Sequence, residues 1–412
     1  MDKRKFITKI LHNPFLKEDP HGSLHMPVYE NVTFEFKTSE EAELAFQGKK
    51  PAHVYSRITN PTVEAFEQRI KAVTDAVGVI AVSSGMAAIS NVFLSIAGSG
   101  DNIVTTKHLF GNTYSLFTKT LKSWGLEVRC ADLTKPDHII RLINGKTRAI
   151  FFETITNPQL EVVDVRALAD IAHAKNVLVV VDTTLTPPYA FESKEFGADI
   201  EILSSTKYIS GGATSVGGLI IDNGTYDWSK NPKLHEDFKQ LGPFALINLL
   251  RRQVYRNLGS CLTPHNAFLQ SVGLETLPLR VDATSANARK LGTFLENHKK
   301  IKKAHYPGLK SSPYYPIAKE QFGDRIGGLL TFDLGSKKEC YTFMNALRFI
   351  RRTTNLNDNR TLVLHPASTI FCEYDEEARK DMNVRDTMIR LSVGIEDADD
   401  LIEDLSQALE RI

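Results

Sequence analysis

Residues 204–212 place Lys207 among hydroxyl side chains, in the sequence SSTKYISGG. They follow residues 199–203, where alternating and β-branched side chains predict a short strand. An amine just past a strand end could form a Schiff base with the aldehyde of a cofactor, while the neighbouring hydroxyls could bind its phosphate. The alternative is a solvated lysine in a polar loop, which is the commoner environment of lysine.

Polar residues also follow other predicted strands. Residues 178–181 are apolar and lead to Asp182, which would either cap a turn or keep a pyridine nitrogen protonated. Asn157 follows the strand predicted at 148–153, and a turn before proline is the alternative to a place in the site. Tyr114 opens a predicted helix, and its ring would either pack in the core or stack on a flat ligand.

Three further features suit anions. Residues 77–82 predict a buried strand that runs through the small residues 83–88 into a helix, a junction that directs backbone N–H groups at an anion. Because this junction has neither a GxGxxG nor a P-loop pattern, it does not predict a dinucleotide or a nucleoside triphosphate. Arg57, on the weakly patterned N-terminal segment, would either anchor that segment or bind a phosphate. Arg390 alternates with apolar neighbours and would be either a surface residue or an inward clamp for a carboxylate.

The predicted strands and helices would position these residues. Strands expected between residues 77 and 222 alternate with helical patterns such as 164–176, which indicates a mostly parallel sheet covered on both faces. Ligands of such sheets bind beyond the carboxyl ends of the strands. We expect an N-terminal arm (1–62), a large domain (63–262) and a C-terminal domain (263–412). The last would hold a bridging helix at 265–298, strands at 327–332 and 388–393, and helices at 340–350 and 398–409.

Composition narrows the classes of partner. The chain has 412 residues, 42% hydrophobic and 24% charged, with a net charge of +1, so it is typical of a globular protein without a global field for nucleic acid or anionic membranes. Its four cysteines lie far apart without a CxxC pair, which argues against a bound metal or a disulfide framework and favours a reducing compartment. With neither a signal-peptide pattern nor an apolar run of membrane-spanning length, we expect a cytoplasmic protein.

Five collinear segments, taken together, resemble the cystathionine γ-synthase family of pyridoxal-phosphate enzymes, which act on sulfur amino acids. They are YSRITNPT (55–62), SSGMAA (83–88), DTT (182–184), SSTKYISGG (204–212) and RLSVGIED (390–397). The resemblance covers most of the chain. It implies an α/β fold-type I pyridoxal-phosphate transferase, with a large, mostly parallel sheet domain, a smaller C-terminal α+β domain and an extended N-terminal arm.

The same resemblance implies a role for each matching position. Lys207 would hold pyridoxal 5'-phosphate and later move protons, Asp182 would pair with the pyridinium nitrogen, and Tyr114 would stack on the ring. Tyr55 and Arg57 would bind the phosphate across a subunit interface, so we expect a homodimer with shared sites that assembles further into a tetramer. The implied cofactor-binding set is Tyr55, Arg57, Ser84, Gly85, Met86, Tyr114, Asn157, Asp182, Thr184, Ser204, Thr206 and Lys207, and the substrate-binding set is Asn157, Asn355 and Arg390.

Four loops bear on the type of reaction. Residues 211–218, 242–244, 262–268 and 355–369 resemble the branch of the family that acts on O-acetylhomoserine, which implies γ-replacement by sulfide or a thiol to give homocysteine or methionine. Three residues or pairs depart from relatives' patterns: Asn112 stands where methionine γ-lyases carry cysteine, Thr183 replaces the usual asparagine, and Ile370 with Phe371 replaces a threonine and a histidine near the substrate entrance. The alternatives are a methionine or cystathionine γ-lyase, a cystathionine γ-synthase, and a protein that binds the cofactor as a sensor.

Overall fold

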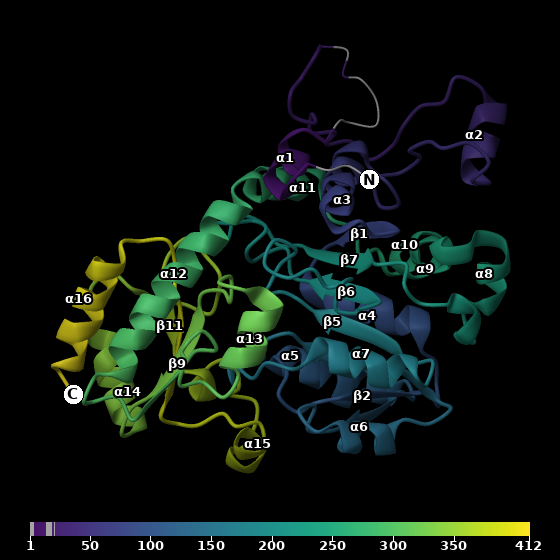
Figure 1. Cartoon of the computed structure of the whole chain (residues 1–412). Helices are drawn as coiled ribbons and strands as arrows, with labels where there is room; N and C mark the ends of the chain where they lie inside the picture. The colour runs from purple at the N-terminus through teal and green to yellow at the C-terminus, as the bar shows by residue number, and fades with distance from the viewer. Residues whose placement is uncertain (1–3, 14–18, 20) are drawn as a thin grey trace.

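The computed structural model describes residues 4–13, 19 and 21–412, and it contains two sheets, each with its own helices (Figure 1). In this view the larger sheet lies on the right and the smaller one on the left. Helix α12 (Leu277–Glu296) runs from the top of the molecule down along the smaller sheet. The C-terminus lies at the outer end of this smaller unit. An α/β chain with a large and a smaller sheet is what the sequence predicted.

The larger sheet has seven strands in the order β1-β7-β6-β5-β4-β2-β3. Neighbours from β6 to β3 run parallel, whereas β7 is antiparallel to both β1 and β6. The central strands are apolar on both faces because helices cover both sides, which confirms the mostly parallel sheet. The strands are β1 (Gly78–Val82), β2 (Asn102–Thr105), β3 (Glu127–Cys130), β4 (Thr147–Glu153), β5 (Leu178–Asp182), β6 (Ile200–Leu203) and β7 (Gly218–Asp222).

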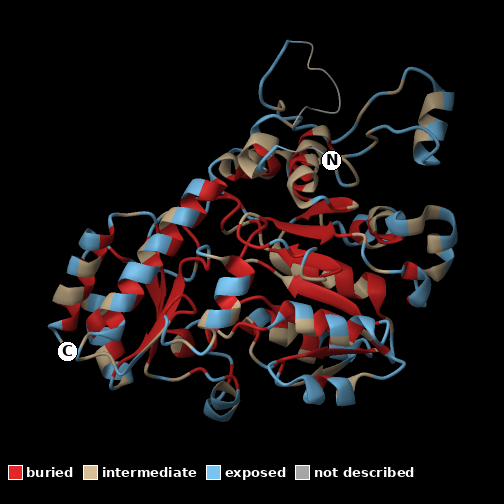
Figure 2. Ribbon diagram, in the orientation of Figure 1, coloured by how far each residue is buried: buried red, intermediate tan, exposed pale blue. Residues whose placement is uncertain are grey.

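Helices pack on both faces of the larger sheet. On one face α4 (Gly85–Ile96) packs against β6 and β7, and on the other α7 (Val165–His173) packs against β4 and β5. The side chains of Ser84 and Asp164 cap these helices by accepting a backbone N–H of the first turn. Figure 2 shows the buried residues of the helices turned toward the sheets and the exposed residues on the outer side. Because helices cover both faces of the sheet, a ligand can reach it at the carboxyl ends of the strands.

The smaller sheet has the strand order β10-β11-β12-β9-β8. Its strands β9 (Leu329–Asp333) and β12 (Met388–Ser392) lie where the sequence predicted strands, and α16 (Ala398–Leu409) matches the predicted helix. The other predicted helix, α14 (Lys337–Ala346), begins earlier than expected because Ser336 caps it. The remaining strands are β8 (Lys303–His305), β10 (Arg351–Arg352) and β11 (Leu362–Leu364).

The bridging helix predicted over 265–298 is in fact two helices, α11 (Pro264–Glu275) and α12. They meet at Thr276, and Pro278 stands in the first turn of α12. Proline lacks the N–H that a continuous helix needs, and its ring clashes with the preceding turn. The prediction of one long helix was therefore wrong, whereas proline is well suited to the start of a new helix.

The N-terminal arm contains two short helices that the sequence analysis missed. α1 (Phe6–Leu11) packs on α3 (Pro61–Thr74) through the buried Ile10. α2 (Ser39–Phe46) buries none of its residues in this chain and projects from the top of the molecule (Figure 1). Thr38 caps α2 by accepting a backbone N–H, so this helix is stabilised mainly by local contacts. The arm is extended, as predicted, but it is not free of helices.

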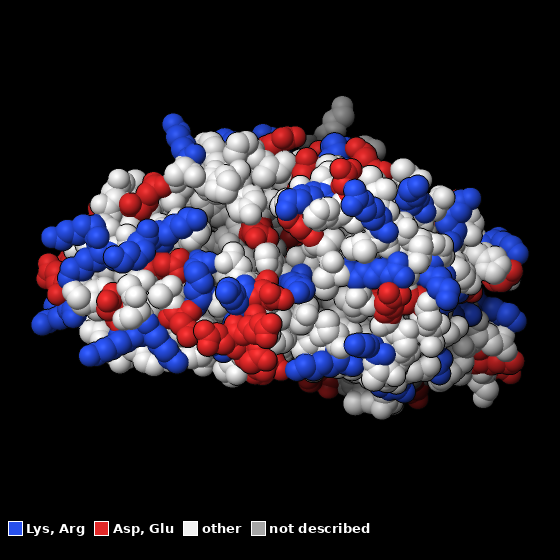
Figure 3. Space-filling view, turned by 90° about the horizontal axis from the view of Figure 1, so that it is seen from below, with Lys and Arg blue, Asp and Glu red and all other residues white. Residues whose placement is uncertain are grey.

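The remaining helical elements are short, and the surface charges are mixed. Among residues 4–13, 19 and 21–412, no helix has the length and apolar character to span a bilayer. On the face seen in Figure 3, Lys and Arg side chains are scattered, and Asp and Glu side chains gather near the middle. The elements not yet named are α5 (Gly111–Ser115), α6 (Pro136–Leu142), α8 (His235–Leu241), α9 (Ala245–Leu249), α10 (Tyr255–Leu258), α13 (Tyr315–Phe322), α15 (Glu376–Asp381), π-helical turns at Leu116–Leu121 and Leu250–Val254, and 3-10 turns at Trp228–Lys230, Gly242–Phe244 and Pro366–Ser368.

Candidate active site

A cavity of about 490 Å³ opens where strands β4, β5 and β6 end. The smaller unit closes one side of it, through the loop before β11 and through β12. The cavity brings together every predicted site residue except Tyr55, Arg57 and Tyr114. Its lining is Ser84, Gly85, Met86, Ile89, Phe110, Thr113, Glu153, Ile155, Asn157, Asp182, Thr184, Leu185, Ser204, Thr206, Lys207, Val216, Thr354, Asn355, Leu356, Ile370 and Arg390.

Lys207 lies in the turn that follows β6. The hydroxyl of Thr206 fixes this turn, because it donates to the backbone oxygen of Gly217 at 3.1 Å and accepts the N–H of the same residue at 3.0 Å. Lys207 Nζ donates to Asn355 Oδ1 at 2.6 Å. Burial, with the positive charge of Arg390, lowers the pKa of Lys207 to about 8. About a tenth of the amine is therefore unprotonated at pH 7, far more than for an ordinary lysine, and this is the form that attacks a carbonyl or accepts a proton.

Asp182 ends β5 and lines the floor of the same cavity. Its carboxylate accepts the N–H of Thr184 at 2.9 Å, so the predicted turn cap is present. The hydroxyl of Thr184 accepts the N–H of Ser204 at 2.9 Å, which ties the end of β5 to the loop that carries Lys207. Burial raises the pKa of Asp182. A buried carboxylate of this kind gains from a cationic N–H donor, such as a protonated ring nitrogen.

The start of α4 offers backbone N–H groups to the cavity. Ser84 caps the helix by accepting the N–H of Ala87 at 3.0 Å, and Gly85 with Met86 forms its first turn. The first N–H groups of a helix have no acceptor within the helix, and the helix dipole favours an anion there. A Cβ at Gly85 would lie 2.8 Å from the Cβ of Ser204, so only glycine lets the two segments approach this closely. The arrangement suits a phosphate.

Arg390 enters the cavity from β12. Its pairing with Thr331 of β9 places it inside the smaller sheet, and the residue is only 2% exposed, so the surface interpretation of Arg390 is excluded. One terminal nitrogen donates to Asn157 Oδ1 at 3.1 Å, and the other donates to the backbone oxygens of Thr354 and Asn355 at 2.9 and 3.0 Å. Burial lowers the pKa of Arg390 to about 9, which leaves the side chain charged at neutral pH. A fixed guanidinium suits a carboxylate ligand.

Tyr114, Tyr55 and Arg57 do not line the cavity. Tyr114 makes an edge contact with Tyr374, with ring centroids 6.1 Å apart, while its neighbours in the chain, Phe110 and Thr113, line the wall. Arg57 donates to the backbone oxygen of residue 256 at 2.7 Å and lies 5.4 Å from the ring of Tyr55. The stacking role of Tyr114 and the phosphate roles of the other two remain predictions.

Asn157 was predicted from the sequence, but Glu153, which ends β4 and lines the same wall, was not. Glu153 stands in register with Asp182 on the neighbouring parallel strand. The signal in the sequence is that two predicted parallel strands both end in an acid. Because such strand ends meet at one edge of the sheet, this pattern could have identified Glu153 as a site residue. Ile155 and Thr354 are further lining residues without a recognisable signal, because apolar or small polar residues of that kind occur throughout the chain.

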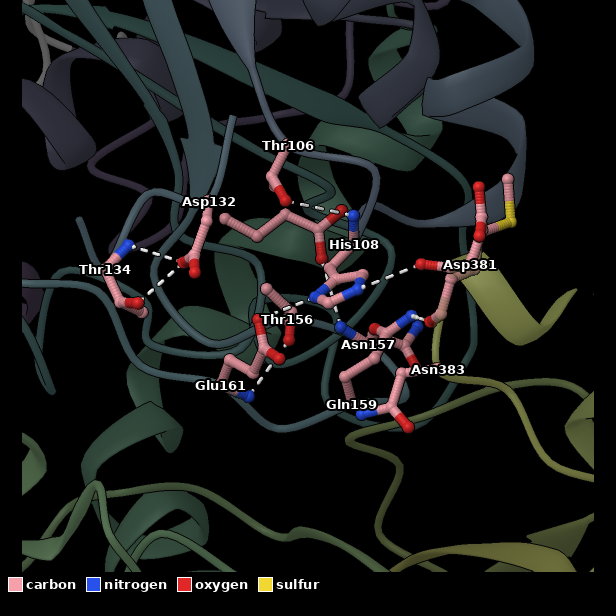
Figure 4. Close-up of polar contacts among 12 residues, drawn as sticks. Thr106, His108, Asp132, Thr134, Thr156, Asn157, Gln159, Glu161, Asp381 and Asn383 are labelled. Atoms are coloured by element: carbon pink, nitrogen blue, oxygen red, sulfur yellow. Dashed lines mark hydrogen bonds and ion pairs between the residues drawn. The ribbon is translucent and has the colours of Figure 1, made fainter. Parts of the chain in front are cut away.

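A second polar network holds the turn after β4 against the C-terminal unit (Figure 4). His108 Nδ1 lies 2.7 Å from Glu161 Oε2, and His108 Nε2 lies 3.3 Å from the backbone oxygen of Asp381. Burial alone would lower the pKa of His108, but the hydrogen bond to Glu161 and its charge raise it overall. Gln159 Nε2 donates to the backbone oxygen of Met382 at 2.6 Å. These contacts fix one wall of the cavity to the end of α15.

Comparison with protein families decides the class. Residues 7–410 match the model of the Cys/Met metabolism PLP-dependent enzyme family. The chain belongs to this family. Its relatives include an O-acetyl-L-homoserine sulfhydrylase from Corynebacterium glutamicum (35% identical, covering 98% of this chain and 96% of the relative), an O-succinylhomoserine sulfhydrylase from Pseudomonas aeruginosa (35%, 95% and 92%) and an L-methionine gamma-lyase from Fusobacterium nucleatum subsp. polymorphum (34%, 98% and 98%).

Solved structures of family members agree with the fold. A putative O-acetylhomoserine (thiol)-lyase from Campylobacter jejuni is 32% identical, with a TM-score of 0.92, and covers 99% of this chain and 100% of its own. That structure carries N'-pyridoxyl-lysine-5'-monophosphate at its position 205. An O-acetylhomoserine sulfhydrylase from Wolinella succinogenes is 48% identical, with a TM-score of 0.78, and covers 85% of this chain and 97% of its own. The predicted fold-type I architecture is thus confirmed.

Family membership makes the protein a pyridoxal-phosphate-dependent enzyme, and the cavity fits that cofactor. Lys207 would hold its aldehyde carbon, Asp182 its ring nitrogen, and the first turn of α4, with the hydroxyls of Ser204 and Thr206, its phosphate. The fit rests on the narrow approach at Gly85, the lowered pKa of Lys207 and the buried carboxylate of Asp182. A sensor would also bind the cofactor aldehyde through the free amine of Lys207, but it would not need Arg390 in the cavity to hold a substrate carboxylate.

Proposed function

We propose that the protein joins sulfide or a thiol to O-acetylhomoserine, giving homocysteine or methionine and acetate. The observation that carries this proposal is the placement of Lys207, Asp182 and Arg390 around one cavity in a chain of this family. The likeness to sulfhydrylases over nearly the whole chain supports γ-replacement as the reaction. Incubation of the purified holoenzyme with O-acetylhomoserine and sulfide, followed by mass spectrometry, should yield homocysteine; no product at saturating substrates would refute it.

The residues divide the work of this reaction. Arg390 would bind the α-carboxylate of the substrate and Asn157 would orient it. The bound cofactor supplies an electron sink for the charge left when the α-proton departs. Lys207 Nζ would accept that α-proton, and the site would then remove a proton from the β-carbon. Acetate leaves from the γ-carbon as its C–O bond breaks, and the sulfur of the acceptor loses its proton as it forms the new bond at that carbon. Protons then return to the β- and α-carbons to complete the product.

The wall at Ile370 predicts the choice of ester. Ile370 lines the cavity and Phe371 is fully buried behind it, so neither provides a cation for the second carboxylate of a succinyl ester. Leaving a carboxylate unpaired in a partly buried site costs about 1–3 kcal/mol, so kcat/KM for O-acetylhomoserine should exceed that for O-succinylhomoserine roughly tenfold or more. Ile370→Arg should reduce the ratio of kcat/KM for O-acetylhomoserine to kcat/KM for O-succinylhomoserine, because arginine supplies the missing cation. Steady-state kinetics with both esters decides, and a higher kcat/KM for the succinyl ester would contradict the substrate proposal.

A γ-lyase is the competing function within the family. We infer that elimination is slow, because Asn112 stands where methionine γ-lyases carry cysteine. The holoenzyme should therefore release α-ketobutyrate and ammonia from methionine or cystathionine more slowly than it forms homocysteine from O-acetylhomoserine and sulfide. The same assay, run on methionine without an acceptor, distinguishes the two, since rapid release of ammonia would assign the protein to the lyases.

The arm supports a shared active site. Tyr55 and Arg57 lie outside the cavity of their own chain, and α2 exposes 68% of Phe46. We propose a homodimer in which these two residues bind the cofactor's phosphate in the neighbouring subunit, with two dimers forming a tetramer. Arg57→Ala should weaken cofactor binding by about 1–3 kcal/mol, the value of a charge-assisted hydrogen bond. Equilibrium dialysis of the apoprotein measures this, and Arg411→Ala, at the far end of the chain, is the control.

Subunit mixing gives the sharper form of this prediction. Inactive Lys207→Ala and weakened Arg57→Ala subunits, unfolded and refolded together, should regain part of the activity, because one site of each mixed dimer then holds both wild-type residues. A fully active monomer in sedimentation would contradict the shared site.

We also propose the domain limits 1–62, 63–262 and 263–412, which the start of α11 at Pro264 supports. A cytoplasmic location is proposed as well, and the four unpaired cysteines support it.

A further inference from the structure

Glu153 is a buried acid that the proposed reaction has not used. It is the last residue of β4, is 7% exposed and stands in register with Asp182 on β5. Residues paired across parallel strands project from the same face of the sheet, so the two carboxyl groups share one wall of the cavity. Burial, and then the negative charge of Asp182, raises the pKa of Glu153.

The carboxyl group of Glu153 joins two segments of the site. Its Oε1 accepts the backbone N–H of Phe110 at 2.6 Å, and its Oε2 accepts the backbone N–H of Asn157 at 3.2 Å. Phe110 precedes α5, the helix that carries Thr113 and Tyr114. Asn157 is the residue whose side chain receives a hydrogen bond from Arg390. One side chain thus links the helix beside the proposed ring site to the residues beside the proposed carboxylate site.

A second buried acid near Asp182 provides a matched comparison. Glu201 is 1% exposed, and burial raises its pKa to about 7. It bonds to the hydroxyls of Thr183 and Ser193 rather than to a backbone N–H group, and it does not line the cavity beside Asp182. Glu201 therefore shares the burial and the nearby charge of Glu153 but not its link between the two site segments.

We propose that Glu153 is a positioning residue, which holds the segment carrying Tyr114 and the side chain of Asn157 in register with Asp182. The inference rests on the proposed function for its substrate side, but the cofactor side is independent of any substrate. Loss of Glu153 leaves two buried backbone N–H groups, on opposite sides of the site, without their acceptor. The cofactor ring and the substrate carboxylate should therefore no longer be held in a fixed position relative to each other.

The test compares Glu153→Gln with Glu201→Gln in the holoenzyme. The amide of Glu153→Gln keeps the size of the side chain but offers one acceptor where two N–H groups compete. We expect KM for the amino-acid substrate to rise about tenfold, as for one lost hydrogen bond, and kcat to fall less. The visible circular-dichroism band of the bound cofactor should weaken as well. Glu201→Gln should change both readouts less than about twofold, whatever it does to the melting temperature.

Glu153→Asp is a second variant, which keeps the carboxyl group and shortens its reach. It should recover more of the cofactor band than Glu153→Gln if the two acceptor oxygens matter. Equal KM and equal bands in wild-type and Glu153→Gln enzymes, with only the melting temperature lowered, would show that Glu153 only stabilises the fold and would overturn the proposal. A weakened band in an enzyme without sulfhydrylase activity would refute the proposed reaction and still support the role of Glu153.

Discussion

Replacement of Lys207 by alanine should lower kcat by about 10⁴-fold or more. The amine both holds the cofactor and moves the substrate's protons in the proposed reaction, so one substitution removes two functions. Burial lowers the pKa of Lys207, so that a free amine is accessible near neutral pH. Alanine has no amine, so it can neither bind the cofactor nor carry a proton. Single-turnover kinetics with O-acetylhomoserine and sulfide, at saturating cofactor, measures the loss.

The control for this experiment is Lys239→Ala. Lys239 is an exposed lysine of α8 that forms a surface ion pair with Glu236 at 2.8 Å, so its loss should leave turnover within about twofold. Thermal unfolding of both variants separates a chemical loss from a folding defect. Substantial turnover by Lys207→Ala, or an equal loss in both variants, would contradict the role of Lys207.

Arg390→Lys should lower kcat/KM by about 10- to 100-fold, mostly through KM. Lysine keeps the charge but lacks the planar fork that contacts Asn157, Thr354 and Asn355 at once. Because a hydrogen bond to a charged group contributes about 1.5–3 kcal/mol, loss of one such bond has this magnitude. Steady-state kinetics at varied O-acetylhomoserine and fixed sulfide gives both constants.

Arg360→Lys is the matched control, since its side chain is 68% exposed and forms an ion pair with Asp358 in the same loop region. It should leave kcat/KM within about twofold. An Arg390→Lys enzyme with wild-type KM would show that another group binds the substrate carboxylate. Unchanged binding of the cofactor in both variants would confine the effect of Arg390 to the substrate side.

Much of the site follows from strand ends that can be read in the sequence. Asp182 directly follows the apolar residues 178–181, and Lys207 lies four residues beyond the end of the next strand at Leu203. The topology of parallel sheets brings such strand ends to one edge. The strand-to-helix junction at Ser84 was predictable for the same reason. Arg390 was ambiguous, because alternation in a strand tells which residues share a face but not whether the second face is buried.

Other features depend on contacts between distant segments. Glu153 gains its position from Phe110 and Asn157, and no local pattern records those hydrogen bonds. The wall around Ile370 likewise depends on how α15 meets the loops after β2 and β4. The break at Thr276 was readable in principle, since Pro278 follows it, but the apolar periodicity on both sides outweighed that signal. The roles proposed for Tyr55 and Arg57 would need a second subunit, which one chain does not contain.

Covalent trapping tests the central claim most directly, which is that the cavity around Lys207 holds the cofactor. Borohydride reduction of the purified holoenzyme fixes pyridoxal phosphate to the amine that binds it, and peptide mapping by mass spectrometry then locates the label. We expect a single pyridoxyl group on the peptide that contains Lys207, and none at that position in Lys207→Ala. A label on another lysine, or no label in the presence of excess cofactor, would contradict the account.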